Sequence, residues 1–103
     1  MSSSRVDAAV VLARAVRFTA DHLVVDLADG RSLSIPLEWY PRLALATPQE
    51  RDQWELIGRG QGVHWPRLDE DLSVESLLAG RRSSESQTSL DRWLAARTKT
   101  SPP

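Results

Sequence analysis

A hairpin signal in the first third of the chain limits its fold more than any other feature. Asp29 and Gly30 separate two short runs: Leu23–Leu27, in which apolar and polar residues alternate at the end, and Arg31–Ile35, in which they alternate throughout. Glycine accepts the positive φ that a tight primed turn requires, and alternation with a period of two gives each strand one buried face. Pro36 cannot donate a ladder hydrogen bond, so the second strand should end there. The pattern predicts an antiparallel hairpin.

A further strand should precede this hairpin and complete a meander. Residues 8–18 are rich in Val, Ala and Leu, and the strand signal is strongest from Val11 to Phe18. After the meander, Thr47-Pro48-Gln49-Glu50 matches a capping box, which predicts a helix from Pro48 to Ile57. Gly58 should end that helix.

The second half of the chain predicts short elements and then a separate tail. Val63–Trp65 can form a short strand, and Ser73 should cap a helix over Val74–Leu78. The predicted class is therefore α+β: a three-stranded antiparallel β-meander packed against two or three short helices, with a C-terminal tail helix. We expect residues 1–80 to form the domain, and residues 81–103 to form a polar linker with a basic amphipathic tail.

Composition narrows the class of protein. The chain has 103 residues, 41% of them hydrophobic, which suits one small globular domain. It has no cysteine, so disulfides and cysteine-ligated zinc are excluded. No apolar run reaches the length of a signal peptide or a membrane-spanning helix, so we expect a cytoplasmic protein without a membrane partner.

Charge is unevenly distributed along the chain. Residues 1–79 carry 8 arginines and 12 acids, a net charge of −4, whereas residues 80–103 carry 5 basic residues and 2 acids, a net charge of +3. A basic tail can contact nucleic acid or an acidic partner, or it can fold back on its own body. A sequence pI of 6.1 does not favour a dedicated nucleic-acid-binding domain.

Several short motifs occur in order between Val16 and Gly80: Asp29-Gly-Arg31, Pro36-Leu-Glu-Trp-Tyr-Pro-Arg-Leu43, Ala46-Thr-Pro-Gln-Glu-Arg51, Trp54-Glu-Leu-Ile-Gly58, Gly62-Val-His-Trp-Pro66, Leu68-Asp-Glu-Asp-Leu-Ser-Val74 and Leu77-Leu-Ala-Gly80. Together they resemble one bacterial family, catalogued as domain of unknown function 2442. The resemblance implies a small α+β domain found in bacteria and their mobile elements. Some members look like the antitoxin-side partner of a small neighbouring protein, and others precede a helix-turn-helix. Residues 81–103 are too short for a helix-turn-helix, and the family brings no catalytic residues.

An acidic run near a histidine is the best enzyme-like cluster. His64 with Asp69, Glu70 and Asp71 has the residue types that bind a divalent metal or transfer protons. His64, Asp69 and Asp71 are the candidate metal ligands. The structural interpretation is favoured, in which the acids stabilise the N-terminus of the next helix or pair with an arginine, and His64 is a hydrogen-bonded structural residue. We expect no cofactor.

Aromatic and arginine side chains gather in the middle of the chain. Trp54 and Trp65 should belong to the core, whereas Trp39 and Tyr40 suit a core or an interface equally. Arg42 and Arg51 can each bind a carboxylate or phosphate. The favoured interpretation is an internal ion pair with Asp69, Glu70 or Asp71, and the alternative is a partner's acidic group.

The tail offers the sharpest binding signal. Leu90, Trp93, Leu94 and Arg97 share one face at helical spacing, so residues 89–97 should form an amphipathic helix. A tryptophan on such a helix is unfavourable in water, so it should pack against another surface. That surface can be the domain of its own chain, a second copy of the chain or a groove of a partner.

These observations favour a non-enzymatic binding module, antitoxin-like, that pairs with a small bacterial protein encoded nearby. A homodimer is a further possibility. The alternatives are a small metal-assisted or acid–base enzyme that uses His64 and the Asp69–Asp71 run, and a DNA-associated regulator that uses the tail. The expected partner-binding residues are Trp39, Tyr40, Arg42, Arg51, Leu90, Trp93, Leu94 and Arg97.

Overall fold

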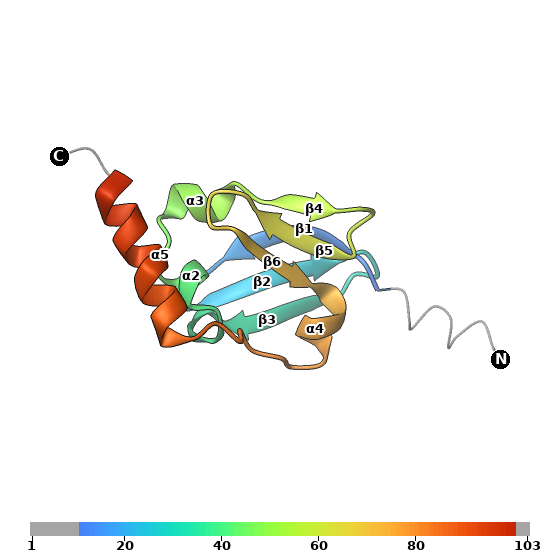
Figure 1. Cartoon of the computed structure of the whole chain (residues 1–103). Coiled ribbons are helices and arrows are strands. Elements are labelled where there is room, and N and C mark those ends of the chain that lie inside the picture. Colours follow the sequence, from blue (N-terminus) through green and yellow to red (C-terminus); the bar gives the residue numbers. More distant parts are fainter. Residues whose placement is uncertain (1–10, 101–103) are drawn as a thin grey trace.

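Two small antiparallel sheets lie face to face, with helices around their ends (Figure 1). The computed structural model describes residues 11–100, and the side chains of residues 11–97. Residues 8–10 of the predicted first strand lie outside the described residues, as do residues 101–103 of the predicted tail. The architecture is α+β, as predicted. None of the described helices is long and apolar enough to cross a membrane.

The first sheet is the predicted meander. Strands β1 (Ala13–Phe18), β2 (His22–Leu27) and β3 (Ser32–Pro36) pair antiparallel in the order β1-β2-β3. Gly30 has φ of +95° in the turn between β2 and β3, which explains the strength of the hairpin signal. The central strand β2 is the most buried strand of this sheet, with four of its six residues buried.

The second sheet corrects the sequence prediction. Strands β4 (Glu55–Ile57), β5 (Gly62–Trp65) and β6 (Glu70–Ser73) form an antiparallel sheet in the order β4-β5-β6. The helix predicted over residues 48–57 stops at Asp52. The rest of that segment pairs with β5, because strand pairing with a distant segment outweighs helix propensity in so short an element. The acidic run enters β6, which was not predicted as a strand, and β6 ends at Ser73, the predicted cap of the following helix.

The short helices follow their predicted capping signals. Helix α3 (Pro48–Asp52) has both bonds of the capping box: Glu50 N–H donates to Thr47 Oγ1 at 3.2 Å, and Thr47 N–H donates to Glu50 Oε1 at 2.9 Å. Helix α4 (Val74–Leu78) is capped by Ser73, whose Oγ accepts from Ser76 N–H at 3.0 Å. The remaining helical elements are the 3₁₀ turn η1 (Leu37–Trp39), α2 (Pro41–Ala44) and α5 (Gln87–Thr100).

The core lies between the inner faces of the two sheets and under α2 and α4. Trp65 of β5 is fully buried, and its ring meets the edge of Phe18 at a centroid distance of 6.3 Å. Trp65 is thus a core residue, as predicted, whereas Trp54 is only partly buried against the core. The fully buried side chains come from both sheets, from α2 and α4, and from the turn before β6: Leu23, Val25, Leu27, Leu43, Val63, Trp65, Leu68 and Val74.

The two sheets are joined at one corner by backbone hydrogen bonds. Ala13 N–H donates to the Gly60 carbonyl at 2.7 Å. Gly60 has φ of +117°, and a Cβ atom built there would lie 2.3 Å from the Ala13 carbonyl oxygen. Only glycine permits this close approach, so the β4–β5 turn needs glycine at this position.

A Gly60→Ala substitution should therefore destabilise the fold by more than about 2 kcal/mol, because it combines positive-φ strain with a backbone clash. Gly30→Ala is the matched control, since Gly30 also has positive φ but has open space around it. It should cost only about 1 kcal/mol. Urea unfolding of both variants measures the difference, and equal losses would show that the contact with Ala13 is unimportant.

Candidate functional site

A hollow runs alongside β6. It has a volume of about 910 Å³, near the upper end of the roughly 300–1,000 Å³ typical of ligand pockets. One wall is β6, and the other is residues 81–86 with the start of α5. We call this hollow the β6 groove. Its lining residues are Tyr40, Arg42, Ile57, Asp69, Glu70, Asp71, Leu72, Ser73, Ser76, Arg81, Arg82, Ser83, Ser84, Glu85, Ser86 and Ser89.

Strand β6 presents a free backbone edge to this groove. It is the last strand of its sheet and pairs only with β5. Val74 N–H donates to the Gln61 carbonyl at 2.9 Å. This bond continues the β5–β6 ladder and shows which residues of β6 form the hydrogen-bonded pairs. Because bonding alternates along an antiparallel pair, the backbone groups of Leu72 point toward β5 and those of Asp71 and Ser73 point away. Within the described residues, neither Asp71 nor Ser73 has a backbone partner on that outer side.

Arg42 of α2 closes one end of the groove. Its Nε and Nη2 donate to the Glu85 carboxylate at 2.9 and 2.6 Å, and its Nη1 donates to the Leu68 carbonyl at 2.9 Å. Its guanidinium also lies over the Trp93 ring, 5.3 Å from the centroid. The predicted internal ion pair exists, but its acid is Glu85, from the segment that was expected to be a linker. The hydrogen bonds from Arg42 lower the pKa of Glu85.

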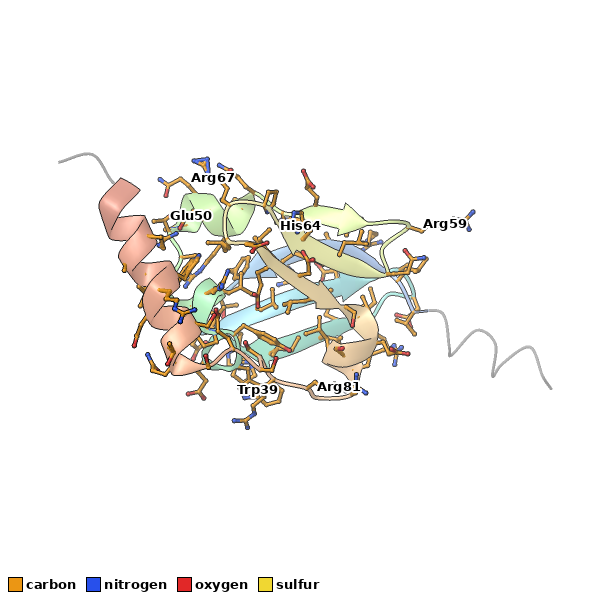
Figure 2. The ribbon with its side chains drawn as sticks, viewed as in Figure 1. Trp39, Glu50, Arg59, His64, Arg67 and Arg81 are labelled. Atoms are coloured by element: carbon orange, nitrogen blue, oxygen red, sulfur yellow. The ribbon has the colours of Figure 1, made fainter. Side chains whose placement is uncertain are left out.

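Helix α5 docks on the body of its own chain. Arg97 donates two hydrogen bonds to Glu50 of α3, at 2.7 and 2.8 Å, and these hold the pKa of Glu50 at about 2. Trp93 packs against the core cluster and has the guanidinium groups of Arg42 and Arg97 near its ring, 5.3 and 4.6 Å from the centroid. Leu90 and Leu94 are also partly buried. Trp93 of the tail therefore packs against the domain of its own chain, the first of the three surfaces named above. Figure 2 shows Glu50 beside α5.

The other predicted partner-binding residues are also engaged within the chain. Tyr40 is buried, and its hydroxyl donates to the Arg81 carbonyl. Trp39 is half-buried, with the Arg82 guanidinium 4.4 Å from its ring centroid. Arg51 donates to the carbonyls of Leu43 and Ala44 at 2.8 and 2.9 Å, so its partners are backbone oxygens and not the predicted acids. In Figure 2, Trp39 and Arg81 lie at one edge of the molecule and His64 lies away from them.

The enzyme-like cluster is divided between two faces of the second sheet. His64 pairs with Asp71 across the strands on the outer face, and this hydrogen bond raises the pKa of His64. Glu70 is opposite the buried Trp65, so it projects from the inner face. Asp69 lies in the turn before β6, with φ of +51°. Across the part of the chain that the structure describes, no three His, Asp or Glu side chains are placed to hold a metal ion.

The sequence analysis grouped Glu70 with Asp69 and Asp71, whereas the structure places it on the other face of β6 from Asp71. It lies half-buried in the groove near Tyr40 and Arg42, and burial raises its pKa to about 7. Glu85, Asp71 and Asp69 add to the rise, and Arg42 opposes it. Among the described residues its carboxylate has no hydrogen bond or ion pair. Strand alternation over residues 70–73 is the signal that separates Glu70 from Asp71.

Comparison with known proteins places the chain in a family. The family described as "Protein of unknown function (DUF2442)" matches residues 13–83, and the chain belongs to it. No curated protein matches the chain.

Two solved structures are similar to this one. A protein of unknown function from Rhodospirillum rubrum is 29% identical, with a TM-score of 0.65, and the match covers 76% of this chain and 96% of that one. An uncharacterized protein from Chromobacterium violaceum is 28% identical, also with a TM-score of 0.65, over 97% of this chain and 91% of its own. The second match must therefore include most of the C-terminal segment.

Arg42 should not tolerate replacement by lysine. Arg42→Lys keeps the charge but loses the forked donation to Glu85 together with the bond to the Leu68 carbonyl, at a cost of about 2–3 kcal/mol. Arg59→Lys, at an exposed arginine in the β4–β5 turn, should be neutral within about 0.5 kcal/mol. Urea unfolding followed by tryptophan fluorescence measures both, and a neutral Arg42→Lys would show that the network contributes little.

Glu70→Gln should stabilise the protein at high pH. The pKa of Glu70 is about 7 in the folded state and its usual value is 4.5. The folded state thus holds the extra proton between these values, and stability falls as pH rises from about 4.5 to 7. Glutamine carries no charge, so it avoids the free energy needed to ionise a half-buried carboxyl group. Because Glu70 is partly exposed to solvent, we expect this gain in the free energy of unfolding to be about 1 kcal/mol at pH 8.

The matched control is Glu38→Gln, at an exposed glutamate of η1. Unfolding curves at pH 5 and pH 8 should show a gain for Glu70→Gln at pH 8 alone and no change for Glu38→Gln. An equal effect of Glu70→Gln at both pH values would contradict the assignment.

Proposed function

We propose that this chain is a non-enzymatic binding module that holds a second, small protein. The observation that carries the proposal is the β6 groove, in which a free strand edge faces a second wall across a hollow of about 910 Å³. Unpaired backbone groups at a strand edge are a ready template for another polypeptide. Many interaction domains bind a partner by this kind of edge.

The arrangement of the acidic residues supports binding over catalysis. A proton-transfer pair needs its two groups within hydrogen-bond reach of one substrate atom. His64 and Glu70 belong to opposite faces of their sheet, so they do not share such a position. The tail arginines support a DNA-associated role less well, because Arg97 is bound to Glu50 and Arg82 lies over Trp39.

In its more specific form, the proposal is an antitoxin-like role. The resemblance of the motifs between Val16 and Gly80 to bacterial domains that accompany a small neighbouring protein supports it. The negative charge of residues 1–79 supports a basic partner, because complementary charge accelerates association and disfavours wrong partners. The module would then act by occlusion and cover the active surface of its partner.

Co-expression with the product of the adjacent gene tests the proposal. The two proteins should co-elute in size-exclusion chromatography as one complex, and the neighbour expressed alone should slow growth. Growth should recover when this chain is supplied with it. A harmless neighbour that elutes separately from this chain would refute the proposal.

A further inference from the structure

We infer that the β6 groove receives an extended segment of the partner as an added strand, with a lysine or arginine of that segment directed at Glu70. The inference rests on the proposed function and names the surface and the chemistry that the partner uses. It is carried by the geometry of the strand edge and by the balance of charge in the groove.

The backbone edge defines how such a segment binds. Asp71 and Ser73 direct their N–H and carbonyl groups toward the groove, two residues apart, as successive donors and acceptors of a ladder require. At one end Arg42 already donates to the Leu68 carbonyl, so the added strand begins after that point. An extended segment that runs from there to Ser73 satisfies the free groups of β6.

The opposite wall distinguishes β6 from the sheet edges at β1 and β4. Residues 81–83 are fixed in place, because Ser83 N–H donates to the Trp39 carbonyl at 3.0 Å and the Arg81 carbonyl accepts from Tyr40. An added strand therefore contacts a second surface. Strand β1, by contrast, is bonded to Gly60 at Ala13. Strand β4 has only three residues, all exposed.

Four acids and three arginines line the groove, and three of the acids, Asp69–Asp71, lie at or next to the free edge of β6, so this edge favours a basic segment. Arg42 interacts electrostatically with Glu70, but its hydrogen bonds go to Glu85 and to backbone carbonyls. Among the described residues, the carboxylates of Asp69 and Glu70 have no hydrogen bond or ion pair. A half-buried carboxylate is stabilised by a cation that reaches it in the same low-dielectric space. Because Glu70 projects from the inner face of β6, the residue opposite it on an added strand points to the same side.

A second copy of the chain fits this edge poorly. Antiparallel pairing of two β6 strands would bring the two acidic runs, Asp69–Asp71, against each other. Like charges directly opposite on neighbouring strands are destabilising. The occupant is therefore a segment of a different protein, of opposite charge.

A direct test uses a synthetic peptide and the full-length chain. The probe is an extended peptide of about seven residues, alternating threonine and valine, with a central lysine, and its control carries glutamate at the centre. In a ¹⁵N titration, the lysine peptide should shift the amide resonances of Asp71 and Ser73 and slow their exchange with solvent. The glutamate peptide should bind at least about tenfold more weakly, as expected for the loss of a partly desolvated charge pair.

Variants separate the backbone contact from the charge contact. Asp71→Pro removes a backbone N–H that faces the groove and leaves the bonds to β5, so it should abolish binding of the lysine peptide. Asp71→Ala removes the same side chain but keeps the N–H, so it should bind as the natural chain does. Glu70→Gln should reduce binding of the lysine peptide to the level of the glutamate peptide.

Several results would overturn the inference: no binding of either peptide, equal binding of both, or equal binding by Asp71→Pro and Asp71→Ala. Concentration-dependent shifts at Asp71 and Ser73 without peptide would assign the edge to a second copy. If the neighbouring gene product still co-elutes with folded Asp71→Pro, the proposed function survives and the β6 groove is not the surface used. If it co-elutes with none of the proteins, the natural chain included, the proposed function itself fails.

Discussion

The position of the C-terminal third of this structure depends on the interactions of the Arg42 guanidinium. It joins four segments at once: its own helix α2, the turn before β6, Glu85 and the Trp93 ring of α5. Both charged side chains of the pair are largely buried, with 16% and 10% of their surface exposed. A planar group with five donors can meet a carboxylate, a carbonyl and a ring together, which a lysine ammonium cannot do. The docking of α5 is therefore polar and directional.

This arrangement creates the groove and determines its charge. Because Glu85 is held by Arg42, residues 81–86 form a wall that faces β6 across the hollow. The same bond directs Arg42, the described cation that lowers the pKa of Glu70, toward Glu85. Burial therefore dominates, and the pKa of Glu70 rises to about 7. The Arg42–Glu85 pair thus accounts both for the opening beside β6 and for the acidic side chains there that have no ion-pair partner among the described residues.

The sequence predicted what depends on neighbouring residues. The Asp29-Gly30 turn, the Thr47 capping box and the Ser73 cap are local, and all three are present. The second sheet was not predicted, because β4 has only three residues, too few to show a strand pattern. Its pairing partner β5 also lies beyond a glycine-rich turn. Glu85 is 43 residues from Arg42, so no spacing rule connects them. The position of Glu70 was missed because the acidic run was interpreted as the approach to a helix, whereas in β6 alternation sends neighbouring acids to opposite faces.

The extent of the family match separates two parts of the groove. Residues 13–83 include β6, Arg42 and Glu70, whereas Glu85 and α5 lie beyond the match. The similar structure from Chromobacterium violaceum covers 97% of this chain, so its match includes most of the C-terminal segment. In this chain that segment supplies the acid that holds Arg42 and the serines along the outer wall. The strand edge and its acids therefore belong to the shared domain, and the segment after it determines whether Arg42 is available to neutralise them.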